Sequence, residues 1–237
     1  MAGVERFVEP LLFYIVFLLS TTLHEAAHAW AAARGGDLTA YHGGQVSLHP
    51  WPHIRRAPVG MVVLPILSVI LMGWPFGFAT APYDPRWARQ YPRRAAWMAL
   101  AGPGANLLLL VLCAVAINAG VLGGLFEAPD RISFGHVASA TASGWGGEGV
   151  AFLLGAVFSL NVVLFAFNLL PLPPLDGSGA LPLLMPRAWV GPYQDFVWSQ
   201  PMLAWVGILV AWRLFDVIIG PVFLAAVNLL YPGAAYS

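Results

Sequence analysis

Residues 11–33 read LLFYIVFLLSTTLHEAAHAWAAA, a run long enough to cross a bilayer as one helix, with His24, Glu25 and His28 in its second half. Histidines four positions apart project from the same face of a helix and can grip one zinc ion, with Glu25 directed at the water that attacks the substrate. A charged residue at the centre of a membrane helix costs about 2.5 to 3.5 kcal/mol and persists where it has a partner or a function. The alternative, two histidines that only form hydrogen bonds inside a bundle, leaves Glu25 without a role. The stretch predicts a membrane helix that carries hydrolytic chemistry.

Composition supports a membrane protein, because 59% of the 237 residues are hydrophobic and 9% are charged. A chain of this size forms one compact bundle, so we expect a single domain over residues 1–237. The net charge is zero and there is no basic stripe, which argues against nucleic acid as a partner. Cys113 is the only cysteine and lies in an apolar run, which excludes an intramolecular disulfide and a zinc site built from thiolates.

Five segments are apolar over a length that matters in a membrane: residues 11–33, 59–79, 95–119, 150–170 and 202–231. The second contains Pro65, Gly73, Pro75 and Gly77, which predict a broken helix. Broken backbone at membrane depth must be buried in protein or line a cavity. The fold class predicted is an all-α polytopic membrane protein with about four full transmembrane helices and one broken or re-entrant segment. Its core covers residues 11–180, and residues 202–231 form the C-terminal span.

The distribution of arginine favours the re-entrant alternative for residues 59–79. If this segment dips in and returns, eight arginines lie on one side of the membrane, and Arg6 and Arg131 lie on the other. The eight are Arg34, Arg55, Arg56, Arg86, Arg89, Arg93, Arg94 and Arg187. By the positive-inside rule the rich side is cytoplasmic. We therefore expect the N-terminus outside and the histidines nearer the cytoplasmic face.

Residues 43–50, GGQVSLHP, alternate apolar Val46 and Leu48 with polar neighbours. This pattern predicts a strand or small β hairpin after the first helix, with a surface loop as the alternative. Residues 120–149, rich in glycine, serine and alanine, are expected to form an outer loop. The histidines outside the first span are expected to form hydrogen bonds in loops: His42, His49, His53 and His136.

Residues 167–179, FNLLPLPPLDGSG, form the second chemical motif. Three prolines in four positions end the preceding helix and present the backbone in an extended form, from which Asp176 can turn back toward the histidines. A carboxylate would complete a His, His, Asp set and leave a fourth position for water. On its own, an Asp-Gly pair after prolines is more often a turn. In the last apolar run, Arg213 and Asp216 lie three positions apart on a helix and most simply pair with each other.

The chain resembles the site-2 protease family of intramembrane zinc metalloproteases. HEAAH matches the first signature of that family, FNLLPLPPLDGS is similar to the second, and AGPGANL at residues 101–107 resembles a stretch on the helix between them. The similarity is greatest to the compact prokaryotic branch, because the chain between residues 33 and 95 is too short and apolar for a PDZ insertion and a CBS module is absent. In the stretch after the first signature, His53 matches the family, whereas Gln45, His49 and Arg55 depart from it.

The resemblance implies one Zn²⁺ per chain, held by His24, His28 and Asp176. It implies Glu25 as general base and acid, and Asn168 as a hydrogen-bond donor to substrate or oxyanion. It places the active site a little inside the cytoplasmic face of a prokaryotic cell membrane. The expected reaction is hydrolysis of peptide bonds in or near the transmembrane segments of membrane-tethered substrates, as in regulated intramembrane proteolysis. The expected partners are such a transmembrane protein or peptide and the lipid bilayer.

Two other classes of function remain open from the sequence. A catalytically silent metal-binding scaffold of the same fold would need neither Glu25 nor Asn168. A transporter is suggested by a broken helix beside a metal site within the membrane, but the chain has no evident internal repeat.

Overall fold

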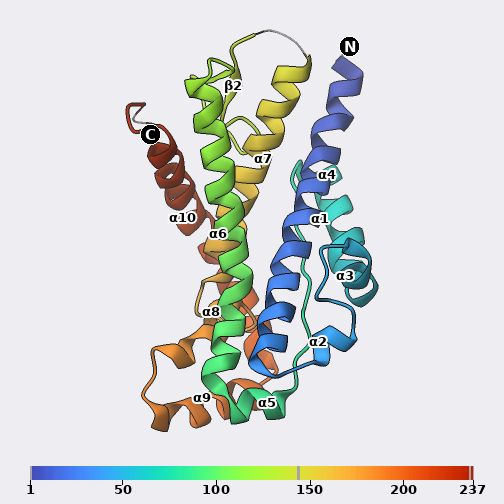
Figure 1. The fold of residues 1–237 in the computed structure, drawn as a ribbon, viewed down its shortest axis with the longest axis vertical. Helices are drawn as coiled ribbons and strands as arrows, with labels where there is room; N and C mark the ends of the chain where they lie inside the picture. The colour runs from blue at the N-terminus through green and yellow to red at the C-terminus, as the bar shows by residue number, and fades with distance from the viewer. Residues whose placement is uncertain (1, 143–144, 235, 237) are drawn as a thin grey trace.

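Long apolar helices form the body of the protein (Figure 1). The computed structural model describes residues 2–142, 145–234 and 236. Within these residues, four helices are long and apolar enough to cross a membrane: α1 (Ala2–Gly35), α6 (Pro92–Leu122), α7 (Trp145–Asn168) and α10 (Met202–Leu230). These helices coincide with four of the five apolar segments, so the predicted polytopic all-α class is confirmed.

The two ends of the bundle differ in what they carry. The start of α1 and the end of α10 lie at one end, together with the connection between α6 and α7 (Figure 1). Part of what the sequence predicts for this end lies outside the described residues and side chains, namely Met1, the Arg6 side chain, and Ser143 and Gly144 of the outer loop. At the other end are short helices, of which α5 spans Pro85–Gln90 and α9 spans Arg187–Ser199.

Helices α1, α6 and α7 pack against one another, and α10 packs chiefly on α7. Phe17 of α1 and Phe158 of α7 are each 2% exposed, and Ile117 of α6 is completely buried. Lipid tails are as apolar as these side chains, so the bundle is held by close packing and by polar contacts between helices rather than by exclusion of water. The polar contacts are concentrated where the functional site lies.

The remaining elements are short and connect the long helices. They are α2 (Thr39–His42), α3 (Pro50–Arg56), the π-helical turn η1 (Val59–Val63), α4 (Leu64–Met72), α8 (Asp176–Ala180) and the 3₁₀ turn η2 (Leu181–Leu183).

The broken segment doubles back. Its helical part, η1 and α4, ends at Gly73, which adopts φ of +80°, a conformation open to glycine. The chain then returns in irregular, non-helical form beside the helix it has left, with Phe78 N–H donating to Gly60 O at 3.0 Å. At the end of this return, Asp84 N–H donates at 2.8 Å to the carboxylate of Asp37, just after α1. The return leads to α5, at the same end of the bundle as the end of α1 (Figure 1). The segment therefore enters and leaves on the same side, as the re-entrant interpretation predicts.

The small sheet is present but not where the alternation placed it. Strands β1 (Phe126–Glu127) and β2 (Ser139–Ala140) pair antiparallel in the connection between α6 and α7. Residues 43–49 form a turn and bends instead, so the strand predicted for 43–50 is wrong and the surface-loop alternative holds. The physical reason is that side chains, and not a second strand, provide the hydrogen bonds of this stretch. The Gln45 side chain donates to Thr80 O, and the His53 ring bonds to Ser47 O.

Candidate active site

His24 and His28 lie one turn apart on α1 and point to the same face, where both are 5% exposed. Their Nε2 atoms are 3.0 Å apart. Helix α1 is the only element that needs to be formed for this pair to exist, because the spacing of four residues fixes the geometry. The surrounding stretch of α1 is apolar, so the two imidazoles sit inside a candidate membrane span.

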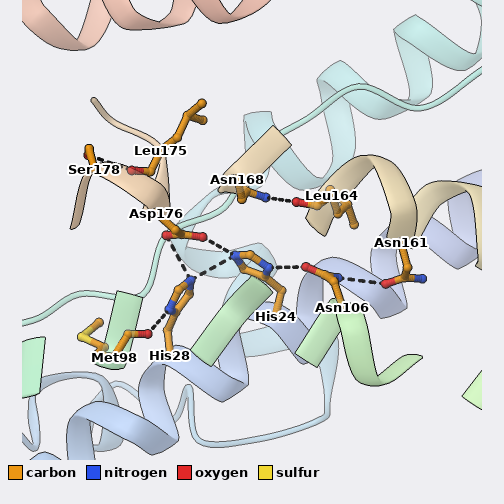
Figure 2. Close-up of polar contacts among 10 residues, drawn as sticks. All are labelled: His24, His28, Met98, Asn106, Asn161, Leu164, Asn168, Leu175, Asp176 and Ser178. Carbon is orange, nitrogen blue, oxygen red and sulfur yellow. Dashed lines mark hydrogen bonds and ion pairs between the residues drawn. The ribbon is translucent and has the colours of Figure 1, made fainter. Parts of the chain in front are cut away.

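Asp176 reaches the histidines from the other signature (Figure 2). Helix α7 ends at Asn168, the proline-rich stretch follows, and Leu175 is extended before α8 begins at Asp176. The carboxylate lies 3.0 Å from His24 Nε2 through Oδ2 and 3.3 Å from His28 Nε2 through Oδ1. One ligand atom from each of the three residues falls within 4.8 Å of the others. The predicted His, His, Asp set is brought together.

Two asparagine amides determine which ring nitrogen of His24 carries the proton (Figure 2). Asn161 Nδ2 donates to Val157 O, and a carbonyl can only accept, so the orientation of the Asn161 amide is fixed. Asn106 Nδ2 therefore donates to Asn161 Oδ1 at 2.9 Å, and Asn106 Oδ1 is left to accept from His24 Nδ1 at 2.5 Å. The neutral imidazole then carries its proton on Nδ1 and turns a lone pair at Nε2 toward the site.

His28 is held in the same way by the backbone. Its Nδ1 lies 2.7 Å from Met98 O, which can only accept, so Nε2 again offers a lone pair. When both imidazoles are neutral, their two lone pairs and the Asp176 carboxylate converge with no hydrogen donor among them. Three acceptors at this distance repel one another unless a cation lies between them, and this donor set in open tetrahedral geometry suits zinc.

Helix α6 leaves room for that cation. Gly102 faces the two histidines, and a Cβ on it would lie 2.5 Å from His24 Nε2 and closer still to His28 Nε2. No side chain larger than hydrogen fits there without displacing the imidazoles. The space in front of the three ligand atoms is therefore kept open by the sequence of α6, which fits a resident metal ion.

Glu25 is buried, and one of its carboxylate oxygens has no hydrogen-bond partner among the described residues. It is 5% exposed, and its Oε2 atom makes no hydrogen bond to the described part of the chain. Together with His28 and Asp176 it lines a cavity of about 400 Å³. A buried carboxylate oxygen without a partner is costly unless a further group binds it. Its position beside the ligands matches the predicted base.

The cavity has walls from elements far apart in the sequence. Ala79 and Ala81 of the return segment form one wall, and Met98 of α6 and Pro174 form others. The remaining lining includes α9 and the start of α10. Several of the lining residues are small, among them Ala99 and Gly179.

Two tyrosines stand in the cavity lining away from the metal ligands. Burial raises the pKa of Tyr83 and of Tyr193 above the ordinary value of 10, so both phenols are neutral at physiological pH. Tyr193 Oη donates to Ser178 O at 2.8 Å, which ties α9 to α8 just after Asp176. This bond helps to fix the helix that carries the third ligand.

Asn168 lies at the end of α7, near the site but turned away from it. Its Nδ2 donates to Leu164 O at 3.0 Å, and Figure 2 shows the amide directed along its own helix. This is the packing role that an asparagine in a helix can also have. A donor role toward the substrate stays a prediction, and it requires the Asn168 amide to leave Leu164.

The histidines outside the first span take no part in the site. His53 Nε2 bonds to Ser47 O, His49 Nδ1 accepts from Trp51 N–H, and His136 contacts Ser133 Oγ. His42 packs edge-on against Tyr41. Among the described residues, one cluster of three or more potential metal ligands exists, the set containing Asp176.

Four contributors to the site were missed by the sequence analysis: Gly102, Asn106, Asn161 and the carbonyl of Met98. Gly102 and Asn106 belong to the AGPGANL stretch, where the motif was seen but not its function. Asn161 had a usable signal, because an amide in the middle of an apolar helix needs a partner. Met98 had none, since any residue supplies a carbonyl.

Comparison with known proteins gives several bacterial relatives. YwhC of Bacillus subtilis, which its name describes as a candidate zinc metalloprotease, is 31% identical over 173 residues, 73% of this chain and 68% of YwhC. Rip2 of Mycolicibacterium smegmatis, named in the same way, is 35% identical over 70% of this chain and 54% of its own length. Rip2 of Mycobacterium tuberculosis is 33% identical over 76% of this chain and 62% of its own length.

No family model matches the chain, and no solved structure matches it. The assignment therefore depends on the relatives and on the site. The chain covers more than two thirds of YwhC at more than 30% identity, and the three predicted ligands meet inside an apolar helix bundle. On these grounds the chain belongs to the site-2 protease family of zinc metalloproteases.

Proposed function

We propose that this integral membrane protein is an intramembrane endopeptidase that hydrolyses peptide bonds in or near transmembrane segments of membrane-tethered proteins. The observation that carries the proposal is the position of the acceptor triad, His24, His28 and Asp176, within the apolar bundle beside an unpartnered Glu25. A metal-binding scaffold without activity has no use for a buried carboxylate whose Oε2 atom finds no hydrogen-bond partner among the described residues. Residues 1–237 would act as one metalloprotease domain.

When bound, zinc supplies a Lewis acid that polarises the substrate carbonyl and lets water lose a proton near neutral pH. Glu25 Oε2 takes that proton and later gives it to the leaving amine, so the same atom serves as base and acid. Asn106 and the Met98 carbonyl keep both histidines in the Nδ1–H form throughout. Asn168, once released from Leu164 O, would donate to the developing oxyanion.

The substrate would enter as an unwound segment. A helix has its carbonyls tied up in hydrogen bonds, so a transmembrane substrate must open locally before its peptide bond can be attacked. The cavity of about 400 Å³ beside Glu25 has room for a short extended stretch but is too small for a helix with its side chains. This size favours unwound peptide.

The distribution of arginines supports one orientation in the membrane. Arg34, Arg89, Arg94 and Arg187 belong to the end of the bundle that carries α5 and α9 (Figure 1). By the positive-inside rule we propose that this end faces the cytoplasm of a prokaryotic cell, with both termini on the outer side. The active site would then open toward the cytoplasmic face.

The test is cleavage of single-span reporter proteins by purified protein in liposomes, comparing wild type with Glu25→Gln. Glu148→Gln, which alters an exposed carboxylate at the start of α7, is the matched control. We expect Glu25→Gln to lose about 10²-fold or more of the cleavage rate while it retains zinc, and Glu148→Gln to cleave normally. Undiminished cleavage by Glu25→Gln would overturn the assignment of the base. Zinc binding by wild type without cleavage of any reporter would favour the silent scaffold.

A further inference from the structure

Helix α10 carries two charged side chains on a face that no other described residue covers. Arg213 and Asp216 are both exposed, and in the most apolar part of this helix 17% of residues are buried. The 29 residues of α10 extend about 43 Å, against a hydrocarbon core of about 30 Å. Asp216 is the middle residue, so it lies near the centre of the membrane even if the helix is displaced by several ångströms.

The expected pairing of these two residues with each other is not formed. Among the described side chains, neither Arg213 nor Asp216 takes part in an ion pair or a hydrogen bond. A charged side chain at this depth costs about 2.5 to 3.5 kcal/mol, and such residues almost always face protein or water. The exposed face of α10 therefore needs a partner that supplies opposite charge.

One line of exposed residues on α10 has a regular spacing. Successive steps of four, three, four, three and four positions along α10 connect Met202, Val206, Leu209, Arg213, Asp216 and Gly220, all of them exposed. This is the spacing of the seam between two helices in a left-handed coiled coil. The buried residues Gly207, Ala211 and Ile219 lie on other sides of the helix. Beyond Gly220 the same spacing reaches Phe223 and Val227, which are buried in the bundle, so the seam ends at Gly220. Up to that point the seam residues are exposed and are separate from the contacts that hold α10 in the bundle.

We propose that this seam binds the same seam of a second copy of the chain, giving a two-fold symmetric dimer in the membrane. Two copies inserted the same way present their α10 helices parallel, so like seam positions lie at the same height and each side chain packs into a hole that includes the partner's neighbouring seam positions. The long Arg213 side chain of each copy can therefore extend along the seam to Asp216 of the other. Two opposite pairs then form, and the net charge at mid-membrane is zero.

The chemistry of the seam selects a second copy over another partner. A different membrane protein would have to supply an acid and a base at the same depth and spacing, whereas the seam complements itself. Gly220 would allow close approach, since a Cβ there meets nothing within 4 Å in the single chain. Small residues at such positions let membrane helices pack backbone to backbone.

Charge variants reconstituted in liposomes and labelled for energy transfer test the proposal. Arg213→Asp places four acids in the dimer and Asp216→Arg places four bases, so we expect each variant alone to associate about tenfold or more weakly than wild type. Mixing the two variants restores opposite charges across the seam, and we expect association to return. Pairing within one helix would give no such rescue, because each chain keeps its like charges. Wild-type association by either single variant, or no gain on mixing, would overturn the proposal.

A cysteine series covers the case in which the charge variants fail to insert. Leu209→Cys lies on the seam, and Leu214→Cys lies about 140° around the helix on another exposed side. Wild type supplies the background, since Cys113 is buried. Oxidation in the membrane should cross-link the Leu209→Cys copies and leave Leu214→Cys monomeric. The dimer would be refuted if both variants cross-linked equally or if neither cross-linked. It would also be refuted if Leu209→Cys cross-linked only to a co-reconstituted reporter substrate. None of these measurements depends on the proposed proteolysis.

Discussion

Replacing Asn106 with leucine tests how the site is held before any metal binds. Leucine has the same branched arrangement of heavy atoms as asparagine, but it can neither accept from His24 Nδ1 nor donate to Asn161 Oδ1, which are bonds of 2.5 and 2.9 Å. Asn106 is completely buried, so both former partners are left without a substitute.

The structure gives two magnitudes for Asn106→Leu. Each stranded buried group costs about 1 to 3 kcal/mol, so the free energy of unfolding should fall by about 2 to 6 kcal/mol for the two groups together. Loss of the outer partner of a metal-binding histidine typically weakens metal affinity by about 10- to 100-fold, because the tautomer and ring orientation of His24 are no longer fixed. The defect should appear in zinc affinity even where the protein still folds.

The assay is competition for zinc against a chromogenic chelator, with the protein in lipid nanodiscs. Asn118→Leu is the matched control, since Asn118 is on the same helix and donates to the carbonyl of Ala114 at 3.0 Å, but is exposed. We expect the control to bind zinc as wild type does. If Asn106→Leu bound zinc with unchanged affinity, the amide chain from Asn161 to His24 would have no role in setting the tautomer, and the argument from converging lone pairs would fail.

Two further substitutions test the space at the metal and the anchor of the return segment. Gly102→Ala should abolish zinc binding because its Cβ would displace both histidines. The control Gly104→Ala, whose Cβ meets nothing within 4 Å, should bind zinc normally. Equal zinc content in the two purified proteins would contradict this expectation. Asp37→Asn puts an amide where a carboxylate accepts from Thr39 and from Asp84 N–H, so thermal unfolding should show a loss of about 1 to 3 kcal/mol. The exposed Asp195→Asn is its control, and an equal loss there would show that charge alone is responsible.

The parts of the site that the sequence predicted are those fixed by local geometry. His24 and His28 meet because a helix places residues four apart on one face, whatever surrounds it. The position of Asp176 depends on a turn of the chain after α7. The prolines before Asp176 gave a local reason to expect that turn. The four spans followed for the same reason, since apolar length is readable one segment at a time.

The parts that were missed depend on contacts between helices. Asn106 and Asn161 are 55 positions apart, and the bond between them exists only because α6 and α7 pack in one particular register. The small sheet was misplaced because alternation over a few residues is a weak signal, and the side chain of Gln45 uses a partner that lies 35 positions away. Single-sequence patterns do not encode such distances.

The re-entrant segment shows how irregular backbone is tolerated at this depth. Along the return, alternate residues find partners within the protein: Phe76 N–H donates to Ser68 Oγ at 2.7 Å, Phe78 N–H donates to Gly60 O, and Thr80 O accepts from Gln45. Successive residues of an extended chain turn their polar groups to opposite sides, so the groups of the intervening residues face the other way. Those residues include Ala79 and Ala81, which line the cavity beside Glu25 and not the lipid. The irregular backbone of the return is therefore bonded within the protein at Phe76, Phe78 and Thr80 and lines a cavity at Ala79 and Ala81, which is the condition that a membrane sets for any non-helical segment.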